Sequence, residues 1–451
     1  MAGNTKKDKR KKKASDRGIV DFMRICYHYF SEMNDWIREM QDPRNSSYTH
    51  YTQEDYIWLG IMKNVCSQKS MRSMDENFNE DVCIATLKIL SGNNDLKEIP
   101  HRDSLNWYLS RLSPECLAGI RKQMITKLLR SKVFDRNKAL GKYWRIVLDG
   151  TGLFYFREKH CDNCLVEKHK DADGNVQYRY YHKVLEAKLV LSDKLVMSLD
   201  TEFIENESET VSKQDCENSA AKRLMDRIKK DFPRLRILIQ ADGLYANEPL
   251  MAECRKKKWK YLFSFKEGCM KTVWDEYSAA CKDDGCCHKT ELTYSSTEKG
   301  IARYVEGVEA YAGKKECMNI ISYESTSSKG KLLRFTWITN LEIKPKKLKE
   351  LVTTGRGRWK IENEGFNNQK NGIYDICHLN SRDKVAMKNH YLLTQIADIM
   401  MQLYLSWNPL VKQKIQTIKN TSSRLLESFR HQRVSDEDVQ YITEHTSVHL
   451  E

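Results

Sequence analysis

Two apolar stretches of the sequence each end in the dipeptide Asp-Gly, and this pattern constrains the fold more than any other feature. The first is YWRIVLDG, which ends in Asp149 and Gly150, and the second is LRILIQADG, which ends in Asp242 and Gly243. Short apolar runs bounded by turn residues are typical of buried strands. In an open α/β sheet, the strand ends form the crevice in which ligands bind. We therefore expect both aspartates at the ligand-binding edge of one sheet.

Two carboxylates at neighbouring strand ends repel each other unless a cation lies between them. Magnesium fits this arrangement, because it prefers oxygen ligands and is usually held by a few carboxylates together with substrate phosphates. The alternative is that each aspartate is an ordinary turn residue, since Asp-Gly is a common turn dipeptide. Either aspartate alone favours a turn, whereas the pair favours a cation site.

The segments around these aspartates predict the order β-β-β-α-β-α-β, with the first helix ending before Pro233. Asn247 is expected to cap the second helix, which has Pro249 in its first turn. This order predicts an α/β layer with a mixed sheet. The preceding residues 18–140 show apolar residues every three or four positions, which indicates an all-helical region.

Three further regions flank or interrupt the α/β layer. Thr52 and Asp55 are spaced as a capping box at the start of one N-terminal helix, and Pro114 interrupts another. Residues 269–340 contain short strand-like pieces and no clear helical pattern. Helical periodicity returns from Lys344 to the end of the sequence.

The charge of the chain indicates a polyanionic partner. The formal net charge is +14, and residues 1–17 hold eight Lys and Arg against Asp8 and Asp16, which leaves 14 − 6 = +8 on the rest. Nucleic acid is the commonest partner of such a protein. No stretch approaches 18 apolar residues, and the N-terminus lacks the apolar segment of a signal peptide, so we expect no membrane span and a cytoplasmic location. The fourteen cysteines are then expected to be mostly reduced thiols.

The stretch GRGRWKIENEGFNNQKNG, residues 355–372, places acids and bases in a distinctive order. On a helix, Arg358, Glu362 and Phe366 lie near one face, and Phe366 is expected to pack on the sheet. Lys370 follows two turns after Glu362 and about 80° round the helix. A carboxylate flanked by cations suits a site that holds a metal and nucleic-acid phosphates together. The alternative is a surface salt bridge between residues four apart.

Three acids in the order Asp149, Asp242 and Glu362 on this scaffold resemble the RNase H-like catalytic core of DDE transposases. IVLDGTGLF resembles the strand of the first acid, and LIQADGLYANEPLMAE resembles that of the second. WITNL together with GRGRWKIENEGFNNQK resembles the third-acid helix of bacterial insertion-sequence transposases that carry a Tyr-Arg-Glu-Lys signature. IPHRDSLNWYLSRL resembles the segment that leads into this core, so the likeness covers roughly residues 100–405.

The sequence departs from that signature at two positions. Gly355 stands where the signature has Tyr, and Gln369 stands where it has Lys, with Lys370 one residue later. A local bulge in the helix would restore the usual register. Glu364 is the rival third acid, but helical spacing turns it to a different face, so Glu362 is preferred.

The resemblance implies a transposase that cuts the ends of an insertion sequence and joins them to target DNA. Asp149 would bridge two Mg²⁺ ions, with Mn²⁺ as a substitute, and Asp242 and Glu362 would each complete one ion site. Arg358 and Lys370 would bind phosphates of double-stranded DNA, at the terminal inverted repeats. A homodimer in a synaptic complex, associated with the nucleoid, is implied as well. The alternatives are a metal-dependent nuclease that does not join, and an inactive transposase retained as a DNA-binding protein.

These inferences define the fold and the expected regions. The expected fold is an RNase H-like mixed α/β sheet with flanking helices, interrupted by a β-rich insertion and preceded by an all-helical domain. The regions are a basic disordered tail (1–17), a helical DNA-binding domain (18–140), the catalytic core (141–268 and 341–405), the β-rich insertion (269–340) and a C-terminal helical region (406–451).

Two groups of cysteine and histidine leave a structural zinc open. The first contains His160, Cys161, Cys164, His169 and His182, and includes a C-x-x-C spacing. The second, in the insertion, contains Cys281, Cys286, Cys287 and His288. A second C-x-x-C is missing, so free thiols are the favoured interpretation of both groups.

Overall fold

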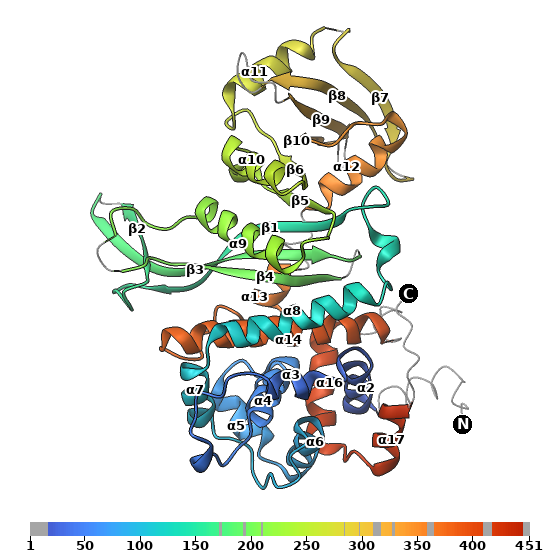
Figure 1. Cartoon of the computed structure of the whole chain (residues 1–451). Helices are drawn as coiled ribbons and strands as arrows, with labels where there is room; N and C mark the ends of the chain where they lie inside the picture. Colours follow the sequence, from blue (N-terminus) through green and yellow to red (C-terminus); the bar gives the residue numbers. More distant parts are fainter. Residues whose placement is uncertain are drawn as a thin grey trace.

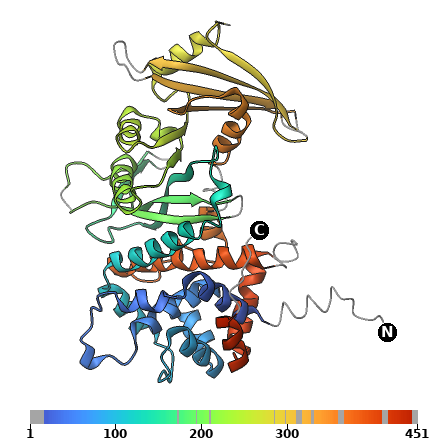
Figure 2. The ribbon, with the colours of Figure 1, turned by 45° about the vertical axis from the view of Figure 1, so that its right-hand side comes forward.

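The computed structural model of the chain has three tiers, which Figures 1 and 2 show from two directions. A bundle of helices forms the first tier, a mixed sheet with helices forms the second, and an antiparallel extension of the same sheet forms the third. The structure describes residues 17–170, 174–192, 195–208, 211–283, 285–296, 298–309, 317–326, 330–358, 365–408 and 417–444. No helix within these ranges is long and apolar enough to cross a membrane.

The helical tier combines segments from both ends of the chain. Its N-terminal members are α2 (Gly18–Phe30), α3 (Met33–Arg38), α4 (Gln53–Val65), α5 (Met71–Phe78), α6 (Asp81–Ser91), α7 (Arg102–Arg111) and α8 (Pro114–Arg130), with short 3-10 helices η1 (Ser46–Tyr48) and η2 (Asp135–Asn137). Its C-terminal members are α14 (Lys384–Trp407), α16 (Ile418–His431) and α17 (Asp436–Glu444). The capping box predicted at Thr52 and Asp55 is confirmed at the start of α4. The break predicted at Pro114 is also confirmed, since α8 begins there.

Helix α14 is the central element of this tier. Most of its residues between Ala386 and Tyr404 are buried, and it packs against α4, α7 and α8. Helix α4 is buried along its whole length, and its Gly60 lets the side chain of Leu393 approach so closely that a Cβ at position 60 would lie 2.8 Å away. Helices that are covered on all sides form the interior of a domain. The N- and C-terminal helices therefore share one core around α14.

The middle tier has the strand order of an RNase H-like sheet. Its elements are β1 (Trp144–Phe156), β2 (Leu165–Lys170), β3 (Val176–Val190), β4 (Val196–Ile204), α9 (Glu217–Asp231), β5 (Ile237–Ala241), η3 (Gly243–Tyr245), α10 (Glu248–Lys256) and β6 (Lys260–Ser264). The spatial order is β4-β3-β1-β5-β6, in which β5 and β6 run parallel to β1, and β3 runs antiparallel to β1 and β4. The predicted fold class, a mixed α/β sheet with flanking helices and a helical region before it, is confirmed.

One strand in this tier is missing from the sequence prediction. Strand β2 lies between the first two predicted strands and pairs with the outer half of β3. It has a charged, exposed sequence, LVEKHK, which carries little of the apolar alternation by which strands are recognised. The observed order is therefore β-β-β-β-α-β-α-β. The predicted cap at Asn247 is confirmed, because its side chain accepts a hydrogen bond from the N–H of Leu250.

The inserted segment continues the same sheet. It contains α11 (Lys271–Ala280), β7 (His288–Thr293), β8 (Lys299–Glu309), β9 (Cys317–Thr326) and β10 (Leu332–Thr339). Strand β10 pairs antiparallel with β6, so ten strands form one sheet. Helix α11 contradicts the expectation of no helix here. Its buried face consists mainly of Val273 and Tyr277, too short a pattern to stand out in the sequence.

A buried polar network joins the sheet to the helical tier. Glu186 and Lys188 of β3 are fully buried, with Nζ and Oε2 3.6 Å apart. From α14, the Tyr391 hydroxyl donates to Glu186 Oε1 at 3.1 Å, and Gln395 Oε1 accepts from Lys188 Nζ at 2.7 Å. Buried charges of this kind require partners on every side. They therefore fix the position of α14 under β3.

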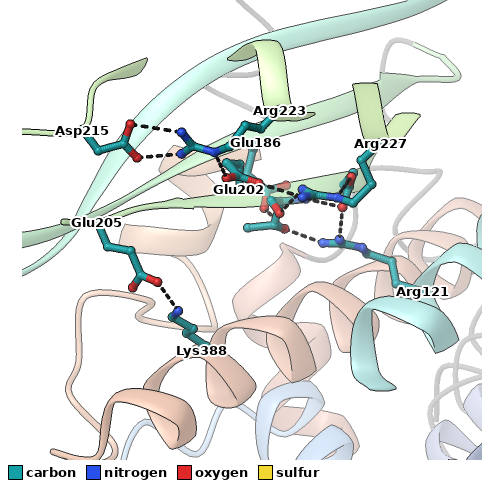
Figure 3. A network of polar contacts seen from close by, with 10 residues as sticks. Arg121, Glu186, Glu202, Glu205, Asp215, Arg223, Arg227 and Lys388 are labelled. Carbon is teal, nitrogen blue, oxygen red and sulfur yellow. Dashed lines mark hydrogen bonds and ion pairs between the residues drawn. The ribbon is translucent and has the colours of Figure 1, made fainter. Parts of the chain in front are cut away.

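Arginines from two other helices extend this network, and Figure 3 shows them converging on the sheet. Arg121 of α8 donates to Asp200 Oδ1 at 2.8 Å and to Ser198 Oγ at 3.0 Å. Arg227 of α9 binds the other oxygen of Asp200 at 2.6 Å and Glu202 at 2.7 Å. Strand β4 is thus held by cations from both of its flanking helices.

Candidate active site

The two aspartates lie near each other at the centre of the sheet, but the prediction that both end their strands holds for Asp242 alone. Strand β1 continues past Asp149 to Phe156, because it stays paired with β3. Strands β1 and β5 pair in parallel with Val147 opposite Gln240. Asp149 lies two residues later within β1, and Asp242 lies two residues later, just past the end of β5. Both side chains are partly exposed. In parallel strands, equivalent positions present side chains to the same face. The predicted juxtaposition of Asp149 and Asp242 therefore follows from the register itself.

Local hydrogen bonds orient both carboxylates. Oδ1 of Asp149 accepts from the N–H of Gly150 at 2.9 Å, and Oδ1 of Asp242 accepts from the N–H of Leu244 at 2.9 Å. The second bond caps the short helix η3, so Asp242 does form the turn that its sequence indicates. In both residues the described hydrogen bonds use Oδ1, which leaves Oδ2 able to ligate a cation.

The charges around Asp149 identify its neighbours. Burial raises the pKa of Asp149 to about 6; the guanidinium of Arg358 opposes this shift, while the carboxylates of Asp242 and Glu217 add to it. The carboxylates of Asp242 and Glu217 are therefore close enough to Asp149 to repel its charged form. A hard divalent cation would relieve this repulsion, so the residues present fit a magnesium site.

Arg358 follows the insertion in the sequence and lies beside Asp149. It follows α12 (Leu348–Arg356), which the 3-10 helix η4 (Pro345–Lys347) precedes. Its Nη1 lies 4.0 Å from Oδ2 of Asp149, and both side chains are about one quarter exposed, at 22% and 24%. The end of α12 is held in place by Gln240, whose Nε2 donates to the carbonyl of Thr354 at 2.6 Å. The strand of the second acid thus positions the arginine beside the first.

Gly355, where the signature has Tyr, has a packing role. A Cβ at this position would lie 2.5 Å from the indole ring of Trp337. Trp337 is buried in strand β10. Helix α12 therefore rests directly on this ring, and no larger side chain fits at position 355.

The candidate third acids, Glu362 and Glu364, lie outside the described residues, but both flanks of their segment are described. Arg358 precedes them beside Asp149, and Phe366 follows them, packed against Val147 of β1 in a small apolar cluster. The prediction that Phe366 packs on the sheet is confirmed. Both ends of the segment are thus anchored at strand β1.

A π-helical turn lies just before the shifted lysine of the signature. Residues 365–367 are π-helical, and they lead into α13 (Asn368–Asn371). A π-helical turn contains one residue more than an α-helical turn, so it shifts the register of the residues that follow it. Gln369 is fully buried and donates to Asp398 Oδ2 at 2.9 Å. The position that would carry the signature lysine therefore faces the core.

Lys370, the next residue, is partly exposed. Burial raises the pKa of Cys377, and the charge of Lys370 opposes this shift, which places the two side chains close together. The thiol of Cys377 is 3.9 Å from the carbonyl oxygen of Gly152. Cys377, whose charge environment includes Lys370, is therefore close to strand β1 three residues past Asp149.

A fourth acid near this site was not predicted from the sequence. Glu217, at the start of α9, forms an ion pair with Lys183 and accepts a hydrogen bond from the Tyr245 hydroxyl at 2.5 Å. Its carboxyl carbon lies 2.6 Å from the place a Cβ on Gly150 would occupy. Gly150 is therefore required by the close approach of Glu217. Lys183, Tyr245 and Gly150 are all distant from Glu217 in the sequence, so no local pattern indicates these contacts.

The central strands thus follow the order β4-β3-β1-β5-β6, with two aspartates and an adjacent arginine near the middle of the sheet. Residues 193–397 match the family model described as the transposase DDE domain. The match includes Asp242 and the stretch from Gly355 to Gly372, and it begins after Asp149.

The comparison with solved structures includes a distant neighbour. A cryo-EM structure of a piggyBac transposase synaptic complex with hairpin DNA aligns with 96% of this chain and 85% of that chain, at 12% sequence identity and a TM-score of 0.42. A comparison with curated proteins gives no match.

Proposed function

We propose that this protein is a DNA transposase that cuts the ends of an insertion sequence and joins them to target DNA by metal-dependent phosphoryl transfer. The observation that carries the proposal is the placement of Asp149 and Asp242 on adjacent parallel strands, with the Arg358 guanidinium 4.0 Å from Asp149. The match of residues 193–397 to a transposase domain supports it. The net charge of +14 suits a DNA partner.

The acid site is proposed to contain Asp149, Asp242 and Glu362. Two Mg²⁺ ions held by these carboxylates, or Mn²⁺ in their place, would activate the attacking water or 3′-hydroxyl and stabilise the leaving oxygen in an in-line displacement. Glu362 is favoured over Glu364 because it is four residues after Arg358 and would share a helical face with it. The carboxylates of Asp149 and Asp242 are already oriented by backbone N–H groups, which reduces the reorganisation needed on binding.

The DNA would be bound by cations on either side of these acids. Arg358 is suited to a bidentate contact with a phosphate, and Lys370 to a more flexible one. Residues 18–140 and the basic tail are proposed to bind the terminal inverted repeats, while 141–268 and 341–405 supply catalysis. A homodimer would bring two ends together in a synaptic complex.

The proposal is tested with purified protein and duplexes carrying the inverted repeats that flank its coding sequence. With Mg²⁺ present, the protein is expected to cut these duplexes at the repeat and to join the free 3′ ends to a target plasmid. Cleavage of unrelated duplexes with equal efficiency, without joined products, would identify a nuclease instead. Binding of the repeats without cleavage in Mg²⁺ or Mn²⁺ would identify a DNA-binding protein.

Loss of either proposed phosphate contact should weaken binding in a salt-dependent manner. Arg358→Ala and Lys370→Ala are each expected to lower affinity for the repeat and to reduce the slope of log affinity against log salt by about one. Fluorescence anisotropy over a range of salt concentrations measures both quantities. Lys271→Ala, at the start of α11 in the insertion, removes the same charge and is expected to leave the slope unchanged. An unchanged slope for Lys370→Ala would make that lysine an ordinary surface charge.

The choice between the two glutamates can be made by amide substitution. Glu362→Gln is expected to abolish cleavage, whereas Glu364→Gln should keep most of the activity, because a position six residues from Arg358 faces away from it on a helix. Cleavage rates in Mg²⁺ compare the two variants directly. An active Glu362→Gln protein beside an inactive Glu364→Gln protein would reverse the assignment.

A further inference from the structure

A second group of metal-binding side chains lies at the far end of strand β1. The thiols of Cys161 and Cys164 are 3.6 Å apart, and Nε2 of His182 is 3.5 Å from the first and 3.4 Å from the second. Within the part of the chain that is described, these three residues are the only group of His, Cys, Asp and Glu whose ligand atoms converge this closely.

These separations match the edges of a tetrahedral zinc site. With Zn–S near 2.3 Å and Zn–N near 2.0–2.1 Å, tetrahedral geometry places two sulfurs about 3.8 Å apart and sulfur and nitrogen about 3.6 Å apart. We propose that Cys161, Cys164 and His182 bind one structural zinc ion, with His160 as the fourth ligand. Two thiolates and two imidazoles favour zinc over magnesium or calcium.

His160 is assigned by its position and its missing partner. Its ring centroid is 6.2 Å from that of His182, with the two planes nearly perpendicular. Its Nε2 is buried and has no hydrogen-bond partner among the described residues. Burying a polar nitrogen without a partner is unfavourable, and ligation of an ion would satisfy it. His160 lies outside the close group that the other three ligands form, so metal binding requires its ring to move toward them.

The loop that carries the cysteines is already held in place. Asn206 donates from Nδ2 to the carbonyl of Cys164 at 2.9 Å, and Asn163 donates to the carbonyl of Asn206 at 2.7 Å.

Other members of the sequence groups lie elsewhere. His169 is exposed and paired with Glu167, 2.5 Å away. In the insertion, Cys286 contacts Asp283, and the His288 ring stacks on Tyr304 rather than facing the cysteines. The zinc interpretation therefore applies to the first group alone.

The ion would stabilise the strand of the first acid from its distal end. His182 lies opposite Phe154 of β1, and its neighbour Lys183 contacts Glu217, which packs on Gly150. The ion would also tie the loop between β1 and β2 to β3. This role is independent of the proposed transposase activity, because it concerns the stability of the sheet.

The test is to purify the full-length protein without chelator and to measure its zinc content by elemental mass spectrometry. About one zinc per chain is expected, and Cys161→Ser and Cys164→Ser should each lose most of it. His160→Ala should weaken zinc affinity by roughly 10–100-fold while retaining binding at high zinc concentration, as expected for loss of one ligand of four. Cys216→Ser and His169→Ala are the matched controls and should keep the full content.

A second measurement uses the wild-type protein, so it tests the proposal even if the cysteine variants fail to fold. Wild-type protein reconstituted with Co²⁺ should show the intense visible absorption of a tetrahedral thiolate site, and added Zn²⁺ should remove it. A wild-type protein that takes up neither ion would overturn the proposal. So would an intact mass two daltons low that maps to a Cys161–Cys164 disulfide, or zinc content unchanged in the cysteine variants.

Discussion

Replacing Asp149 with asparagine is expected to slow cleavage of element ends by about 10³-fold or more, while the ends remain bound. A carboxylate that holds a catalytic metal contributes several kcal/mol of transition-state stabilisation, and each 1.4 kcal/mol corresponds to tenfold in rate. Asparagine has nearly the same shape and can still accept from the N–H of Gly150, so the strand should not be disturbed. Asp242→Asn is expected to behave in the same way, since Asp242 caps η3 through an oxygen that asparagine retains.

These rates are measured with pre-bound DNA ends in saturating Mg²⁺. Asp275→Asn, on the exposed side of α11, removes one carboxylate far from the site and should leave the rate within twofold of wild type. A variant at Asp149 or Asp242 that kept one tenth or more of the wild-type rate would remove that residue from the catalytic group.

Replacing Arg121 with alanine is expected to lower the free energy of unfolding by about 3–5 kcal/mol. Arg121 is almost fully buried, with 2% of its side chain exposed, and it donates to Asp200 and Ser198 on strand β4. Its removal would leave Asp200 with Arg227 as its remaining cation partner in the network. Breaking one side of a buried ion pair is costly because the other charge stays buried.

Chemical denaturation of Arg121→Ala and of a control variant on the same helix, Lys122→Ala, measures this effect. Lys122 is the next residue on the helix, is 45% exposed, and pairs with Asp231 at 2.6 Å. Lys122→Ala is expected to cost less than about 1 kcal/mol, because exposed ion pairs contribute little. Equal losses for the two variants would show that the buried network does not fix the sheet on the helices.

The arrangement of the sheet could be predicted because its strands are buried and apolar. The stretches ending in Asp149 and Asp242 carry a clear strand pattern. Asp242 does follow the end of its strand, whereas β1 continues past Asp149 through its pairing with β3. The register of β1 on β5 then brings the two residues into line. Local features such as the cap at Asn247 could also be predicted from the sequence, because each depends on residues a few positions apart.

Features that depend on contacts between distant segments could not be predicted. Glu217 approaches Gly150 from a helix 67 positions later, and nothing near either residue indicates it. Strand β2 is exposed and charged, so it lacks the pattern of a buried strand. The π-helical turn at residues 365–367 was foreseen only as one explanation of the displaced Lys370, since sequence spacing alone does not distinguish a bulge from a lost contact.

The most direct test of the central claim is a crystal structure of the protein bound to a cleaved element end in Mn²⁺, with anomalous diffraction used to locate the metal. The account predicts two manganese peaks about 3.5–4 Å apart. Asp149 should ligate both ions, Asp242 one and Glu362 the other, with the DNA phosphate between Arg358 and Lys370. Manganese bound away from Asp149 and Asp242, or no manganese beside an ordered DNA end, would contradict it.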